Sequence, residues 1–69
     1  MKTKAIVQAM HTGVLVRVQD VVSRMEYPGR VTAIIIRKGK KRKIDVSAEV
    51  TDPRGRSVMI VRPEDIVPG

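Results

Sequence analysis

The alternation of apolar and polar positions predicts β-strands in two clear stretches of the chain. In "KIDVSAEVT", residues 43–51, and in "GVLVRVQ", residues 13–19, apolar residues occupy every second position. A period of two places successive side chains on opposite faces of a strand. We therefore expect two strands with one face in the core, and in the first of them the core face consists of Ile44, Val46, Ala48 and Val50.

Turn signals predict how these strands connect to others. "DPRG" at 52–55 has Asp, Pro and Gly at the positions that favour a type I turn, which leads to a strand around 56–62. "RKGKKRK" at 37–43 has a glycine between two apolar stretches. It predicts a hairpin tip that joins strands 30–37 and 42–50.

Three further segments complete the predicted fold. "EYPG" at 26–29 predicts another turn, and Pro63 followed by two acids predicts one short helical turn near the end of the sequence. "KAIVQAM" at 4–10 fits either a strand or a short helix, and we favour a strand.

The residue composition favours an all-β domain. Val and Ile make up 19 of the 69 residues and there is a single Leu, and β-branched side chains fit pleated surfaces better than helices. The predicted strands form a five-stranded antiparallel meander in one domain, residues 1–69. A flat sheet of this size would leave an apolar face and two edges bare, so we expect a small barrel.

The inventory of reactive groups does not favour an enzyme. There is no Cys, His11 is the only imidazole, and the serines lie in no recognisable nucleophile motif. We therefore expect no catalytic activity, no metal site and no cofactor. No apolar run approaches the roughly 20 residues that cross a bilayer, so we expect a cytoplasmic protein without a membrane partner.

The shortage of aromatic residues excludes several binding modes. Tyr27 is the only aromatic residue. Modules that bind Pro-rich peptides, methyl-lysine or unstacked RNA bases all depend on aromatic surfaces. A nucleic acid would therefore have to be bound mainly through its phosphates.

Positive charge is concentrated in one short segment. The chain has a net charge of +7, and residues 37–43 supply six cations with no acid among them. Such a cluster is typical of a local polyanion-binding surface, whereas a hairpin tip that only keeps the protein soluble normally includes acids. We expect this segment, here called the basic tip, to bind RNA or DNA without sequence preference. It comprises Arg37, Lys38, Gly39, Lys40, Lys41, Arg42 and Lys43.

Other residues extend this prediction. Gly39 would let the backbone turn tightly, and Arg30, Arg54 and Arg56 could widen the binding surface. A solvated turn and an acidic protein partner are the alternatives to a polyanion.

Two apolar stretches favour a protein partner as the second hypothesis. "AIII" at 33–36 and "VMIV" at 58–61 are apolar on both faces of their strands, and a thin barrel has only one interior. Either an N-terminal segment covers the outer side chains, or they form a docking or homodimer surface. The candidate interface residues are Ile34, Ile36, Met59 and Val61.

The stretch "YPGRVTAIIIRKGKKRKIDVSAE" resembles the KOW motif of transcription elongation factors and several ribosomal proteins. The matching features are Gly29, then Val31 and Ile34 in a strand, the basic tip, and Ile44 and Val46 in a second strand. "GRSVMIVRPEDIV" resembles the end of many SH3-like barrels. The resemblance covers residues 26–67, and it implies an SH3-like barrel that associates with RNA, the ribosome or RNA polymerase.

Overall fold

The computed structural model describes the backbone of residues 1–69 and every side chain except that of Arg42. The elements in chain order are α1 (Thr3–Thr12), β1 (Leu15–Gln19), β2 (Glu26–Lys38), η1 (Lys40–Arg42), β3 (Ile44–Thr51), β4 (Val58–Val61), η2 (Pro63–Asp65) and β5 (Ile66–Pro68).

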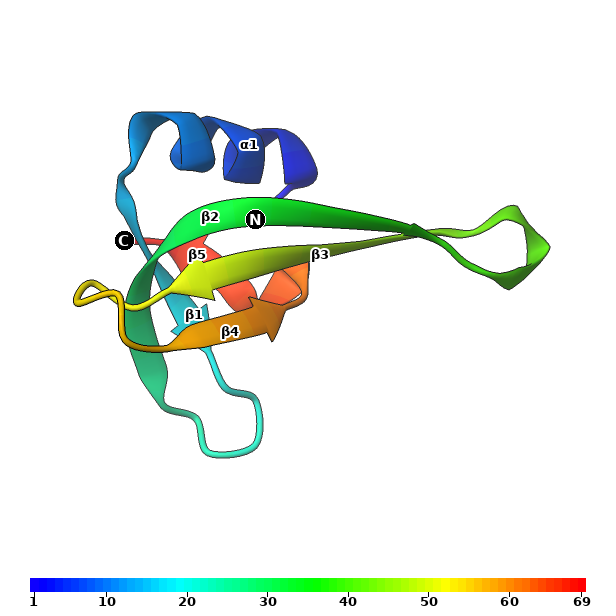
Figure 1. Ribbon diagram of the computed structural model, residues 1–69. Helices are drawn as coiled ribbons and strands as arrows, with labels where there is room; N and C mark the ends of the chain where they lie inside the picture. Colours follow the sequence, from blue (N-terminus) through cyan, green and yellow to red (C-terminus); the bar gives the residue numbers. More distant parts are fainter.

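The five strands form one antiparallel sheet in the order β4-β3-β2-β1-β5, with α1 on one side of it (Figure 1). The predicted five-stranded antiparallel sheet is thus confirmed, but its membership differs from the prediction. The last strand pairs with β1, so the chain does not form a simple meander. Over residues 1–69 the sheet is not closed into the predicted barrel, because β4 and β5 remain as its two edges.

The strand predicted at residues 4–10 is wrong, since this segment lies within α1. Ile6 and Ala9 are three residues apart and are both buried, which is the spacing of one helical face. Gly13 ends the helix in the left-handed conformation, with φ of 71°, and its N–H donates to the Ala9 carbonyl oxygen at 3.0 Å. The helical period of the apolar residues therefore prevails over the β-preference of Ile6 and Val7.

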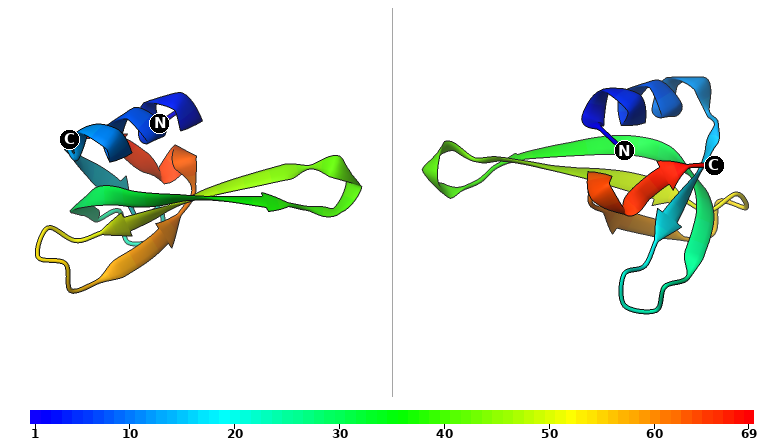
Figure 2. Two further views of the ribbon diagram at one scale, coloured as in Figure 1. Left: turned by 45° about the horizontal axis from the view of Figure 1, so that its top comes forward. Right: turned by 180° about the vertical axis from the view of Figure 1, so that it is seen from behind.

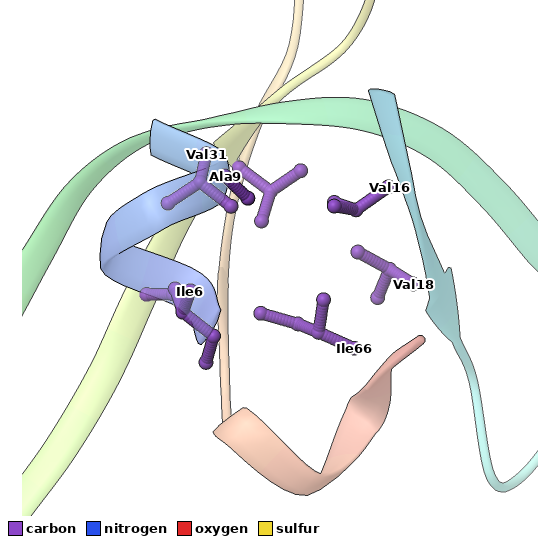
Figure 3. Close-up of a cluster of buried hydrophobic side chains, with 8 residues drawn as sticks. Ile6, Ala9, Val16, Val18, Val31 and Ile66 are labelled. Atoms are coloured by element: carbon purple, nitrogen blue, oxygen red, sulfur yellow. The ribbon is translucent and has the colours of Figure 1, made fainter. Parts of the chain in front are cut away.

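The core lies between α1 and the concave side of the sheet. Figure 3 shows the side chains of Ile6 and Ala9 on α1 directed toward those of Val16, Val18 and Ile66. The complete set of buried apolar residues is Ile6, Ala9, Val16, Val18, Val31, Ala48, Val50 and Ile66. The helix thus covers the apolar side of a sheet that does not close on itself.

The turn predicted at residues 26–29 is also wrong. These residues belong to β2, where Pro28 lies opposite Arg17 and Gly29 opposite Val16. β3 pairs with β2 only as far as Arg30, so Pro28 has a neighbouring strand on one side, and a residue without an N–H is tolerated there.

The connection between β1 and β2 is instead built around Asp20. The Asp20 N–H donates to the Met25 carbonyl oxygen at 2.9 Å, and its carboxylate accepts the N–H of Val22 at 3.0 Å. An Asp side chain that binds the backbone two residues ahead is a standard way of forming a turn.

Three other sequence predictions are confirmed. The DPRG turn joins β3 to β4, and the Gly55 N–H donates to the Asp52 carbonyl oxygen at 2.9 Å. Pro63 begins the short helix η2, whose first turn contains two acids. In β3, Ala48 and Val50 are buried on one face, as the alternation predicts.

A β-bulge at Thr32 explains the spacing of apolar residues in β2. Val31 lies opposite Val50 and Ala33 opposite Glu49, so Thr32 is the extra residue. Its hydroxyl oxygen lies 2.7 Å from Glu49 Oε1 and 3.0 Å from Thr51 Oγ1. Because of the bulge, Val31 and Ile34 both pack toward the core although they are three residues apart.

Candidate nucleic-acid interface

The basic tip closes a hairpin that extends away from the rest of the protein. β1 pairs with β2 only up to Arg30, and β4 pairs with β3 only from Ala48 onward. Residues 35–47 therefore form a two-stranded ribbon, here called the arm, with the basic tip at its end. Figures 1 and 2 show the arm extending beyond the rest of the sheet and beyond α1 in every view.

The turn at the end of the arm is formed by the backbone of a lysine. The Gly39 N–H donates to the Lys43 carbonyl oxygen at 2.7 Å, which closes the loop. Lys41 has φ of 61° and ψ of 35°, in the left-handed region, whereas Gly39 is extended with φ of −81°. The prediction that Gly39 provides the special turn conformation is therefore wrong, because Lys41 provides it.

The described cationic side chains of the arm are exposed and form no ion pair with a described acid of the protein. All basic-tip residues whose side chains are described are exposed. Among the described side chains, the ion pairs join Arg17 to Glu26 and Arg62 to Glu64 and Asp65, all of them outside the arm. Asp45 is the only acid between residues 35 and 47, so this segment carries a net charge of +5.

The other predicted contributors to the surface lie far from the basic tip. Arg54 and Arg56 are in the turn at the opposite end of β3 (Figure 1). Arg30 lies in β2 opposite Thr51, at the same end, and its Nε donates to the Gly13 carbonyl oxygen at 3.0 Å. The structure therefore brings residues 37–43 together but does not bring these three arginines to them.

The arm also carries exposed apolar side chains, of which the sequence pattern had indicated Ile36 but not Ile44. Ile36 is 67% exposed and Ile44 is 70% exposed. Ile36 lies opposite Val46, and Ile44 lies opposite Lys38. Ile44 continues the core face of β3, as its alternation predicts, but this part of the strand extends beyond the core.

The four residues proposed as a protein interface occupy different environments. Ile34, Met59 and Val61 are partly buried and pack against the core, whereas Ile36 is exposed on the arm. On the edge strand β4 the exposed side chains are instead Val58 and Ile60.

A shallow apolar groove lies beside β4. It is lined by side chains that include Tyr27 and Pro28 from the start of β2, Pro53 from the turn after β3 and Met59 from β4. The sequence offered one signal of this groove, the only aromatic residue of the chain.

The described residues include neither a helix that could span a membrane nor a cluster of side chains that could hold a metal ion. No helix in this part of the chain is long and apolar enough to span a membrane. The described His, Asp and Glu side chains form no group of three that could hold a metal ion.

Comparison with known proteins found no family model, no curated protein and no solved structure that matches the chain.

Proposed function

We propose that the protein is a non-enzymatic, nucleic-acid-binding accessory protein that contacts the phosphate backbone of RNA or DNA through its basic tip. The observation that carries the proposal is the projection of the basic tip, whose described side chains are exposed, on an arm that lies beyond the rest of the sheet (Figure 2). The free energy of binding would come from neutralised phosphates and released counterions.

The separation of the basic tip from the acids of the protein supports this proposal. The six cations lie within seven consecutive residues. Charges separated by no more than a Debye length, about 8 Å at physiological salt, are only partly screened from one another. The cations of the basic tip therefore act together on an approaching polyanion. Asp45, the one acid on the arm, lies opposite Arg37 and offsets only a small part of the charge.

The resemblance to the KOW motif points in the same direction. The features that carry the resemblance are Gly29, Val31 and Ile34 in β2, the basic tip, and the apolar positions of β3. On this basis we propose that the open sheet is a variant of the SH3-like barrel, and that the ribosome or RNA polymerase in the cytoplasm is where the protein acts.

A binding titration with two matched variants tests the proposal. Lys40→Gln, Lys41→Gln and Lys43→Gln together remove three charges from the basic tip. The control variant, Lys4→Gln, Arg54→Gln and Arg56→Gln, removes three charges elsewhere and has the same net charge. Fluorescence anisotropy with a labelled duplex DNA and a structured RNA, at about 50 mM and about 200 mM salt, gives affinity and salt dependence.

The expected results are specific. The unmodified protein should bind with a slope of log affinity against log salt approaching roughly −5, for up to six phosphates on duplex DNA. The basic-tip variant should reduce the slope to roughly −3 and weaken binding by orders of magnitude, and the control should change affinity far less. Equal losses in the two variants would reject the basic tip as the binding site.

The competing hypothesis is a protein-interaction module, or a homodimer, that uses apolar strand faces. It predicts an association that is insensitive to salt and a mass of two chains or more by light scattering. Absence of nucleic-acid binding at low salt would favour this hypothesis over the first.

A further inference from the structure

We infer that the apolar face of the arm lies on the floor of the major groove of duplex DNA, while the basic tip contacts the adjoining phosphates. This inference rests on the proposed function and adds the class of nucleic acid and the way in which the arm contacts it. It follows from one feature of the arm, namely the combination of exposed apolar side chains and a net charge of +5 on one narrow ribbon.

The apolar face is continuous along the arm. Ile36 and Val46 are direct cross-strand neighbours, and Ile44 is the next residue of β3 on the same face. Lys38, opposite Ile44, ends this row with a cation. The opposite face has a different character, since Arg37 there lies across from Asp45.

An uncovered apolar ribbon is not a stable arrangement by itself. A two-stranded ribbon in water is marginally stable without packing on one of its faces. Neither the helix nor the other strands reach this part of the arm in Figures 1 and 2, and Ile36 and Ile44 are 67% and 70% exposed. The face therefore gains most from a ligand that covers it.

The positions of the charges restrict the kind of ligand. The cations occupy the end of the arm, beyond Ile36 and Ile44 along the two strands. An insertion of the arm into a lipid bilayer would bury these cations before the apolar pair, at a high cost in desolvation. A suitable ligand instead presents anions beside an apolar surface that a ribbon can lie against.

The major groove of B-form DNA has these properties. It is about 12 Å wide and admits a two-stranded β-ribbon, whose strands lie about 4.8 Å apart. Its walls are phosphates. Its floor presents hydrogen-bonding base edges, and at each A·T pair also the C5-methyl group of thymine, which makes apolar contacts with side chains. The deep and narrow major groove of A-form RNA does not admit such a ribbon. The shape of the arm therefore favours duplex DNA over duplex RNA.

The test compares three duplexes of one sequence. The first is a thymine-rich DNA, the second has deoxyuridine at each thymine position, and the third is the RNA equivalent. We expect the RNA duplex to bind about tenfold more weakly than the DNA, and the loss of thymine methyl groups to weaken binding several-fold.

A pair of variants assigns the effect to the apolar face. Ile36→Thr with Ile44→Thr keeps β-branched residues in the strands but places a hydroxyl on the face. The control, Val58→Thr with Ile60→Thr, makes the same kind of change at strand positions that are 57% and 56% exposed. Only the first variant should lose the distinction between thymine and deoxyuridine, and its salt slope should remain that of the unmodified protein.

The outcomes separate this inference from the proposed function. Equal affinity for the DNA and RNA duplexes, or an unchanged affinity in the Ile36 and Ile44 variant, would overturn the major-groove inference. If binding were still salt-dependent, the proposed function would stand. Tighter binding to polyglutamate or to vesicles of anionic lipid than to duplex DNA would overturn the major-groove inference as well. If the protein bound no nucleic acid at low salt, both the major-groove inference and the proposed function would be rejected.

Discussion

Gly29 on β2 lies directly against Val50 on β3: a Cβ atom at position 29 would come within 2.5 Å of Val50 Cγ1 and 2.8 Å of the Thr51 carbonyl oxygen. This close approach occurs where the third strand meets the part of β2 that pairs with β1 (Figure 1). The glycine is needed here for space, and its role is independent of the turn that the sequence pattern had assigned to it.

Gly29→Ala should therefore destabilise the protein by about 1–3 kcal/mol, the usual cost of overpacking a core. Urea denaturation monitored by circular dichroism measures this free energy. In a Val50→Ala background the penalty should become smaller, because one of the two clashes is removed. It should not vanish, since the Thr51 carbonyl oxygen remains. An equal penalty in both backgrounds would contradict the contact.

The packing of α1 predicts a large effect at Ile6. This side chain is 1% exposed, so Ile6→Ala should lower the free energy of unfolding by about 2–5 kcal/mol. Val22→Ala, at a residue that is 95% exposed, should change it by no more than about 0.5 kcal/mol. Similar unfolding midpoints for the two variants would show that α1 does not pack on the sheet.

The left-handed conformation of Lys41 predicts a stabilising substitution in the basic tip. For a residue with a Cβ atom, the left-handed conformation is roughly 1–2 kcal/mol less favourable than its preferred conformation. Glycine has no Cβ atom and avoids this cost. Lys41→Gly should therefore be more stable than Lys40→Gly by about 1 kcal/mol. The two variants lose the same charge, so thermal unfolding isolates the backbone effect. Equal stabilities would place the strained residue elsewhere.

The β1–β2 turn predicts a pH-dependent signal at Asp20. The backbone N–H of Val22, followed by the hydroxyl and N–H of Ser23, lowers the pKa of Asp20 from its ordinary value of 3.8. A lowered pKa in the folded state means that the carboxylate stabilises the fold above the ordinary value, and that this contribution is lost as pH falls through the folded-state pKa.

An NMR titration of the Val22 and Ser23 amides, from about pH 6 to about pH 2, checks this expectation. Both amides should shift together with a midpoint below that of an ordinary aspartate, and Asp20→Asn should abolish the shift. A midpoint at or above the ordinary value would contradict the hydrogen bonds to Asp20.

The sequence was sufficient to predict the parts of the fold that depend on local patterns. Alternation identified the buried face of β3, the DPRG turn supplied its own hydrogen bonds, and Pro63 marked the start of η2. The charge cluster likewise identified the basic tip, because six cations in seven residues are almost never buried together without acidic partners.

The parts that were missed depend on contacts between distant segments. Residues 4–10 have the composition of a strand. They form a helix because the open side of the sheet provides a surface against which Ile6 and Ala9, on one face of α1, can pack. The outward position of Ile36 and Ile44 depends on where β1 and β4 stop pairing. The apolar stretch 33–36 had indicated Ile36 as an outward residue. No local pattern specifies where β1 and β4 stop pairing, so the exposure of Ile44 could be identified only from the assembled sheet.

The buried apolar residues of the described structure all lie outside residues 35–47. Under the proposed function, folding and ligand contact therefore depend on separate stretches of the chain. Under that proposal, mutations in the arm would alter what the protein recognises while the remainder of the chain, the body, keeps its stability, so recognition would be free to diversify in evolution. For the same reason the body is a natural scaffold for grafted hairpins of other sequence and length.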